Sequence, residues 1–173
     1  MRRIVSILLS LIPLMIFNAC HEVNSSTTVS VSVSWTEGYS TETDMFDAAD
    51  LVVLARLNKC EPEIRSDLVF TRDYFVIERI FKGDVSIGEE ICVLQTGGEY
   101  EGKITSELAE IPLMSENDVY LLYLRLTEPN EKYGQYYVIK GGYQGAALYK
   151  DDKLVPLSEQ NNGMVDEMNI RMK

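Results

Sequence analysis

The chain has 173 residues, with 27 acidic against 16 basic side chains, a formal net charge of −11 and an isoelectric point near 4.5. An acidic balance of this size argues against a nucleic-acid-binding protein, because a phosphate backbone attracts basic surfaces. The length allows one domain with a substantial hydrophobic core.

Residues 1–19 are typical of a bacterial secretory signal peptide rather than of a folded segment. Arg2 and Arg3 give a positive start, residues 4–17 are mostly apolar, and a small residue, Ala19, precedes the expected cut. A bilayer-spanning helix needs roughly 20 apolar residues, and this run is shorter and contains Pro13. The segment therefore predicts export and removal of the leader.

The residues around the expected cut, FNAC at 17–20, resemble the lipobox of bacterial lipoproteins. An ordinary leader peptidase requires a small residue third before the cut, where this chain has the bulky Phe17. The sequence departs from the usual lipobox at Phe17, where Leu is usual, and at Asn18, where a small residue is commoner. The resemblance implies that Cys20 becomes the new N-terminus and carries a diacylglyceryl group, with palmitate-type acyl chains that anchor the protein stably in the membrane. Plain secretion is the alternative.

The segment after Cys20 predicts a lipid-anchored, Ser/Thr-rich tether over residues 20–40. Eleven of the twenty residues from Asn24 to Thr43 are Ser or Thr, a composition that packs poorly. From Val29 to Trp35 apolar residues alternate with serines, so an added edge strand is the other interpretation. The only histidine, His21, lies in this tether, where a zinc site or a catalytic base has no fold to hold it.

Loss of Arg2 and Arg3 with the leader leaves 14 basic against 27 acidic residues, a net charge of about −13. An anionic membrane surface repels such a domain, so contact with the bilayer is expected through the lipid on Cys20 and not through the domain.

The domain is predicted to span residues 41–157, followed by a C-terminal tail, 158–173, without a clear hydrophobic period. It opens with a short helix, because Thr41 can cap it, Asp44 follows three residues later, and apolar residues form one side. Strands are then expected at residues 51–57, 70–84, 89–98, 118–126 and 135–150. In the second of these, Phe75 and Ile77 are expected to face the core, and the fifth is expected to bend at Gly141 and Gly142.

Five strands with a long connection between the third and the fourth are typical of a small closed barrel, in which every strand edge is paired. The oligonucleotide/oligosaccharide-binding (OB) barrel has this strand count and this gap. The predicted fold class is therefore mainly all-β, a five-stranded OB-like barrel with one short helix before the first strand.

Five segments in order, AADLVVLARL, YFVIERIFKGD, ICVLQTGG, SENDVYLLYLRL and YYVIKGGYQGAALY, resemble uncharacterised secreted proteins and lipoproteins of Gram-positive bacteria. The arrangement is also similar to the netrin-like barrel of the tissue inhibitors of metalloproteinases. The resemblance covers about Ala49 to Lys150 and implies a fold more than a function. Those inhibitors bind the catalytic zinc through a free N-terminal cysteine, whereas Cys20 is expected to carry lipid, so protease inhibition is only a minor alternative.

Cys60 and Cys92 are expected toward opposite ends of the barrel, too far apart for a disulfide; two free thiols are the favoured interpretation. The acidic pairs at Glu89, Glu99 and Asp151 fall at strand ends and match no calcium-loop pattern, which predicts a solvated rim. The glycines of QTGG and KGGYQG lack the spacing of a phosphate-binding loop and are expected to form a turn and a strand bulge.

Tyrosines give the one sequence hint of a binding surface. Ten are present, and five lie between residues 133 and 149. Tyr136 and Tyr143 are candidate ligand-binding residues, because exposed tyrosines stack on sugars or pack against peptides; core packing is the other interpretation. No catalytic residue, metal ligand or cofactor is predicted.

Together these features predict an extracytoplasmic lipoprotein whose barrel binds an envelope protein or glycan without catalysis. A hydrolase-type enzyme that uses surface acids, and a purely structural domain of a larger envelope complex, are the alternatives.

Overall fold

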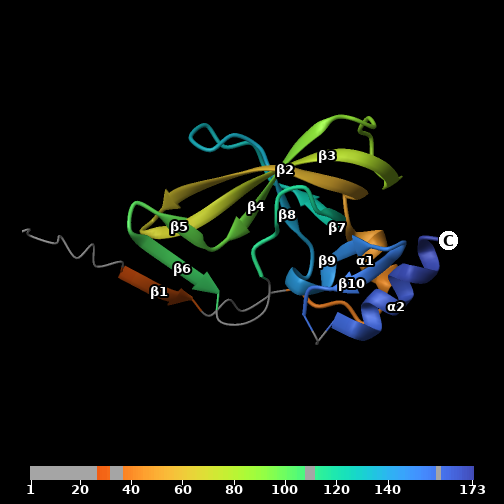
Figure 1. Cartoon of the computed structure of the whole chain (residues 1–173). Coiled ribbons are helices and arrows are strands. Elements are labelled where there is room, and N and C mark those ends of the chain that lie inside the picture. The colour runs from red at the N-terminus through yellow and green to blue at the C-terminus, as the bar shows by residue number, and fades with distance from the viewer. Residues whose placement is uncertain (1–26, 32–36, 108–111, 159–160) are drawn as a thin grey trace, which may run out of the picture.

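The structure is a computed structural model that describes residues 27–31, 37–107, 112–158 and 161–173. The predicted signal peptide, Cys20 and His21 lie outside these residues. The described chain is mainly β, as predicted, with two α-helices at one end (Figure 1). Within the described ranges, no helix is both long and apolar enough to cross a membrane.

Five strands close into a barrel. They are β2 (Leu51–Arg65), β3 (Leu68–Lys82), β4 (Glu90–Thr96), β7 (Val119–Leu126) and β8 (Tyr137–Ile139). β2 pairs with β3 and β3 with β4, both antiparallel; β4 pairs in parallel with β8, and β8 returns through β7 to β2. Each strand of this ring has two neighbours in it, which confirms the predicted OB-like barrel.

The predicted fifth strand, 135–150, is interrupted into two strands, which both run antiparallel to β7 along the edge opposite β2. β8 ends before a 3₁₀ turn, η1 (Gly142–Gly145), and β9 (Ala146–Lys150) then pairs with β7 and with β10 (Lys153–Pro156). The chain bends at Gly141 and Gly142, as predicted, because these residues have φ angles of 61° and 59°, which glycine adopts without strain. At the end of the turn, a Cβ on Gly145 would lie 2.2 Å from the Lys140 carbonyl oxygen.

A separate three-stranded sheet contains β1 (Thr27–Val31), β5 (Gly98–Tyr100) and β6 (Lys103–Glu107), in the order β1-β6-β5. The long connection after the third barrel strand supplies β5 and β6. β1 pairs in parallel with β6, so the edge-strand interpretation of residues 29–35 is confirmed at 29–31, and the remainder lies outside the described residues. The prediction of a poorly packed tether over residues 20–40 is therefore wrong for residues 27–31, which belong to a sheet.

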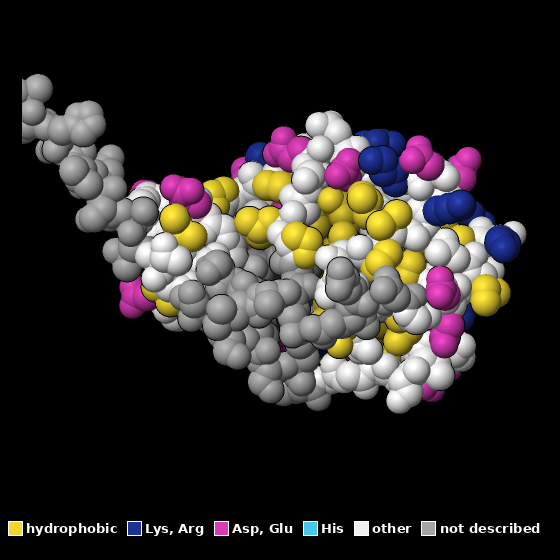
Figure 2. All heavy atoms as spheres, turned by 60° about the horizontal axis from the view of Figure 1, so that its bottom comes forward, with side chains coloured by type: hydrophobic (Ala, Val, Ile, Leu, Met, Phe, Trp, Pro, Cys, Tyr) yellow, Lys and Arg dark blue, Asp and Glu magenta, His cyan; other side chains and the backbone are white. Residues whose placement is uncertain are grey.

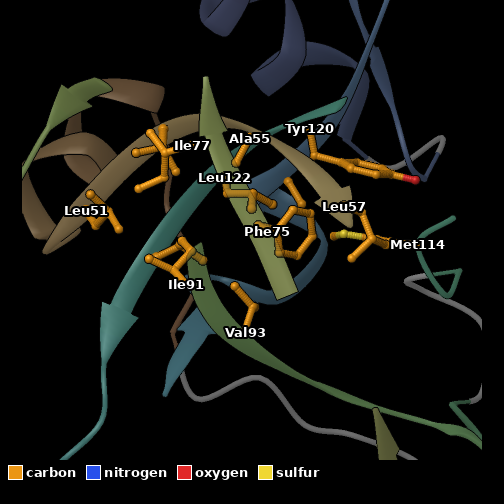
Figure 3. Packing of buried hydrophobic residues seen from close by; sticks show 13 residues of the cluster. Leu51, Ala55, Leu57, Phe75, Ile77, Ile91, Val93, Met114, Tyr120 and Leu122 are labelled. Atoms are coloured by element: carbon orange, nitrogen blue, oxygen red, sulfur yellow. The ribbon is translucent and has the colours of Figure 1, made fainter. Parts of the chain in front are cut away.

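The barrel interior forms the first hydrophobic cluster (Figure 3). Phe75 and Ile77 are 0% and 1% exposed, which confirms the predicted inward face of β3. The Phe75 ring packs edge-on against Tyr120, with ring centroids 6.1 Å apart. Because side chains alternate along a strand, β2 and β7 also present an opposite apolar face, which carries Val52, Leu54 and the rest of a second cluster.

Two helices cover this second face. α1 (Glu42–Ala48) begins as predicted, with the Thr41 hydroxyl oxygen accepting a hydrogen bond from the Asp44 amide. α2 (Asn162–Arg171) is formed by the segment predicted to be a tail, and it buries Met164, Val165 and Met168 in the second cluster. The predicted domain end at 157 is therefore wrong.

A buried polar network joins both helices to the sheet. Glu42 in α1 is 3% exposed, and its carboxylate accepts hydrogen bonds from the Tyr123 hydroxyl of β7, at 2.5 Å, and from Arg171 Nη2 of α2, at 2.8 Å. Burial and this carboxylate raise the pKa of the Tyr123 phenol well above its usual range, so Tyr123 is the donor. The network fixes the C-terminal helix against the barrel, because a buried carboxylate requires its partners.

Candidate functional site

The outer face of β3 and β4 is where OB barrels bind ligands, between the loop after the first barrel strand and the loop before the fifth. In this protein the first is the β2–β3 hairpin, which projects beyond the barrel and turns at Ser66 and Asp67 with φ angles of 48° and 68°. The second is the β7–β8 connection, residues 127–136. One group of side chains gathers between them, here called the arginine–tyrosine face: Arg65, Phe70, Arg72, Tyr74, Tyr133 and Tyr136.

The strand alternation of β3 explains why these side chains point outward. Thr71, Asp73 and Phe75 are buried on the inner face, so Arg72 and Tyr74 lie on the outer face and are half-buried. The residues of β2 that pair with these positions share the same outer face.

Arg65 is held between two tyrosine rings. Its guanidinium carbon lies 4.1 Å from the Tyr133 ring centroid and 4.7 Å from that of Tyr136. Nη1 donates to the Tyr136 hydroxyl at 2.9 Å, and Nε donates to Glu63. Arg65 is only 9% exposed, and its buried Nη2 has no hydrogen-bond partner among the described residues. Cation–π contacts of this kind fix the two rings of the loop over the hairpin.

Arg72 shares the same carboxylate. Its Nε donates to Glu63 Oε2 at 2.9 Å, and its Nη2 donates to the Tyr133 carbonyl at 2.8 Å. One carboxylate thus serves two guanidinium groups. Beside them, burial and a hydrogen bond to Glu61 raise the pKa of the Tyr74 phenol to about 12.

A surface cavity of about 420 Å³ adjoins the arginine–tyrosine face, lined by Cys60, Glu61, Pro62, Glu63, Arg72 and Tyr74. It runs along the part of β2 that extends past its pairing with β7, which covers only Leu51 to Arg56. The cavity therefore offers a guanidinium, a phenol and carboxylates within one hollow. It does not offer an activated thiol, because burial and the neighbouring Asp73 raise the pKa of Cys60 to about 12.

The structure separates the two tyrosines predicted from the sequence. Tyr136 lies on the arginine–tyrosine face. Tyr143 lies in η1, where its carbonyl accepts a hydrogen bond from Asn161 Nδ2 at 2.9 Å. Cys20, the predicted lipid attachment site, lies outside the described residues.

KGGYQG contains the turn η1, whereas in QTGG the single residue Gly97 joins β4 to β5. In KGGYQG the Gln144 side chain clamps the chain before α1: Oε1 accepts from the Tyr39 amide and Nε2 donates to the Tyr39 carbonyl, each at 2.9 Å. In QTGG, a Cβ on Gly98 would lie 2.8 Å from Thr71 Oγ1. The six acids at positions 89–90, 99, 101 and 151–152 are all exposed, and no three Cys, His, Asp or Glu side chains converge as a metal site in the described ranges.

Cys60 and Cys92 are both free, as expected, but the predicted reason is wrong. Cys60 lies opposite Asp73 and Cys92 opposite Tyr74, so the two flank β3 at adjacent positions. Their side chains do not meet, because each cysteine shares a face of the sheet with its cross-strand partner, and the two partners point to opposite faces. Cys60 shares the inner face with Asp73, and Cys92 shares the outer face with Tyr74.

Comparison with known proteins places the chain in no family. No protein-family model matches its sequence, and no curated protein proves similar to it. A functional assignment therefore depends on the residues of the face and on the sequence of the N-terminal segment.

Proposed function

We propose that the protein is an extracytoplasmic lipoprotein, anchored through Cys20, whose OB-like barrel binds an envelope protein or glycan without catalysis. The N-terminal sequence supports the anchor. The barrel supports the binding role, because its aromatic and cationic side chains gather at the position where this architecture takes its ligands.

The arginine–tyrosine face is the observation that carries the proposal. Tyr74, Tyr133 and Tyr136 are half-buried, so each presents part of a ring to solvent while the rest is fixed by packing. A rigid ring with a polar tip suits stacking on a sugar or packing against a peptide. Arg72, placed beside the cavity, can donate to hydroxyl, carbonyl or carboxylate groups of either partner.

A binding role fits the distribution of carboxyl groups better than acid–base catalysis does. Acid–base chemistry uses a carboxyl of raised pKa in an accessible cleft. Burial raises the pKa of Asp73 to about 7, but this side chain is 1% exposed inside the barrel. Glu61, beside the cavity, has a lowered pKa because Lys59 and Tyr74 hydrogen-bond its carboxylate.

Site-specific photo-crosslinking in intact cells tests the binding face. The full chain, with the photoreactive phenylalanine derivative p-benzoylphenylalanine at position 74 or 133, is irradiated and its adducts are separated. Benzophenones insert into C–H bonds of proteins and sugars alike. The matched control carries the same group at Tyr100, an exposed position on the small sheet, 39% exposed.

We expect one adduct that positions 74 and 133 share and that the control lacks. Arg72→Ala should lower its yield several-fold, since it removes the donor beside the cavity. The same adducts from position 100, or none from 74 and 133, would contradict the assignment of this face.

A further inference from the structure

Half of the basic side chains among the described residues have a carboxylate partner, and the other half are not evenly spread. Arg56, Lys59, Arg65, Arg72, Lys103, Lys140 and Arg171 each lie within salt-bridge distance of a carboxylate. No such pair is found within the described residues for Arg79, Lys82, Arg125, Lys132, Lys150, Lys153 and Lys173. In Figure 2, Lys and Arg side chains gather at the end of the molecule that carries the helices.

Three of these cations line one cavity of about 390 Å³. Arg79 comes from β3, Lys153 from β10, and Lys173 lies two residues beyond α2. The remaining lining residues are Tyr149, Asp152, Asn169 and Met172. Asp152 is the one acidic side chain among them, and it accepts a hydrogen bond from the Tyr149 hydroxyl at 3.0 Å. The lining side chains therefore carry an excess of two positive charges.

The hairpin adds a second observation. Lys150 and Lys153 lie directly opposite each other across β9 and β10, and like charges at such positions destabilise a strand pair. The turn between them consists of Asp151 and Asp152, whose φ angles are 51° and 60°. By contrast, Lys82 already donates to the carbonyls of Phe46 and Asp47, each at 2.9 Å. The lysines of the hairpin have no comparable partner in the described part of the chain.

We propose that this cavity binds a phosphate group, either free or in the head group of a lipid. Arg79, Lys153 and Lys173 line it from three separate parts of the chain, so one anion with several oxygens can accept from all of them. A bound phosphate would also relieve the repulsion between Lys150 and Lys153. The cavity is larger than a phosphate alone and leaves room for a group attached to it. This site is separate from the arginine–tyrosine face and does not depend on the function proposed for that face.

Binding of two probes to the full chain tests the site. The first is inorganic phosphate, followed by amide and guanidinium NMR shifts. The second is vesicles of phosphatidylglycerol, compared with vesicles of phosphatidylcholine by co-sedimentation. Insertion of the apolar N-terminal segment contributes to binding of both kinds of vesicle, so it does not affect the difference between them. The test variant replaces Arg79, Lys153 and Lys173 by Gln. A matched control makes the same three charge changes at Lys59, Lys103 and Lys132, which are outside the cavity.

A tenfold or greater loss of affinity in the cavity variant, with less than a twofold loss in the control, is the expected result. Saturable shifts at the cavity with inorganic phosphate would assign a free phosphate; a difference seen only with phosphatidylglycerol would assign a lipid head group. If neither probe binds, or both variants lose affinity equally, the proposal is wrong. The single variant Lys173→Gln, on the last residue, repeats the comparison if the triple variant does not fold.

Discussion

Replacing Phe75 with alanine should lower the free energy of unfolding by about 3–5 kcal/mol, the usual cost of removing a buried phenylalanine ring. Phe75 is 0% exposed in the centre of the barrel, and its ring contacts Tyr120 edge-on (Figure 3). Chemical denaturation of the variant and the wild type, followed by circular dichroism, measures the difference.

Two controls separate this cost from a general effect of losing an aromatic ring. Phe75→Leu keeps most of the volume and should cost less than half as much. Tyr100→Ala removes an exposed ring of the small sheet, 39% exposed, and should change the free energy of unfolding by less than about 0.5 kcal/mol. A loss below 1 kcal/mol for Phe75→Ala would mean that the register of β3 in the barrel is wrong.

The second large effect is a pH dependence that Asp73→Asn should remove. Burial raises the pKa of the Asp73 carboxyl from 3.8 to about 7, against a smaller opposing effect of the Cys60 thiol, which hydrogen-bonds the carboxylate. Its Oδ1 has no hydrogen-bond partner among the described residues. Cys60 of β2 faces this carboxyl, and Glu116, which accepts from the Cys60 amide at 3.1 Å, adds a negative charge near that thiol.

The sign of the effect follows from the raised pKa. The folded protein holds the Asp73 proton more tightly than the unfolded chain, so this contribution to stability is complete below pH 3.8 and is lost as the pH rises through about 7. Between pH 5 and pH 8 the wild type should lose about 2–3 kcal/mol that Asp73→Asn does not lose. Denaturant titrations of both proteins at the two pH values measure the difference, and equal losses in the two proteins would show that Asp73 does not ionise in this way.

Local patterns in the sequence were sufficient for the barrel strands and for the first helix. Thr41 and Asp44 predicted the start of α1, and the alternation through Phe75 and Ile77 predicted the inner face of β3. Gly141 and Gly142 predicted the bend in the last strand region, but the pattern could not show the 3₁₀ turn that interrupts it, because a bend within one strand and a turn between two strands leave the same glycines. α2 was missed because its apolar residues become an interior face only when α1 and β10 pack against them.

The candidate site depended more strongly on long-range contacts. Tyr136 could be proposed from its residue type, but Arg65 and Arg72 resemble ordinary exposed strand positions in the sequence. They become part of a site because the hairpin extends past the barrel and a distant loop folds over it. The Arg65 to Tyr136 hydrogen bond spans 71 residues. Cys60 was misplaced for a similar reason, since β2 continues to Arg65 instead of ending near the cysteine.

Anchoring through Cys20 is the central claim, and metabolic labelling tests it most directly. The full chain and a Cys20→Ala variant are expressed in a bacterium fed an alkyne-tagged fatty acid, and the purified proteins are coupled to a fluorescent azide. Label on the wild type, with none on the variant, is the predicted result, and it would direct the search for a partner to the outer surface of the membrane. Label on neither protein, or equal label on both, would contradict lipid attachment at Cys20.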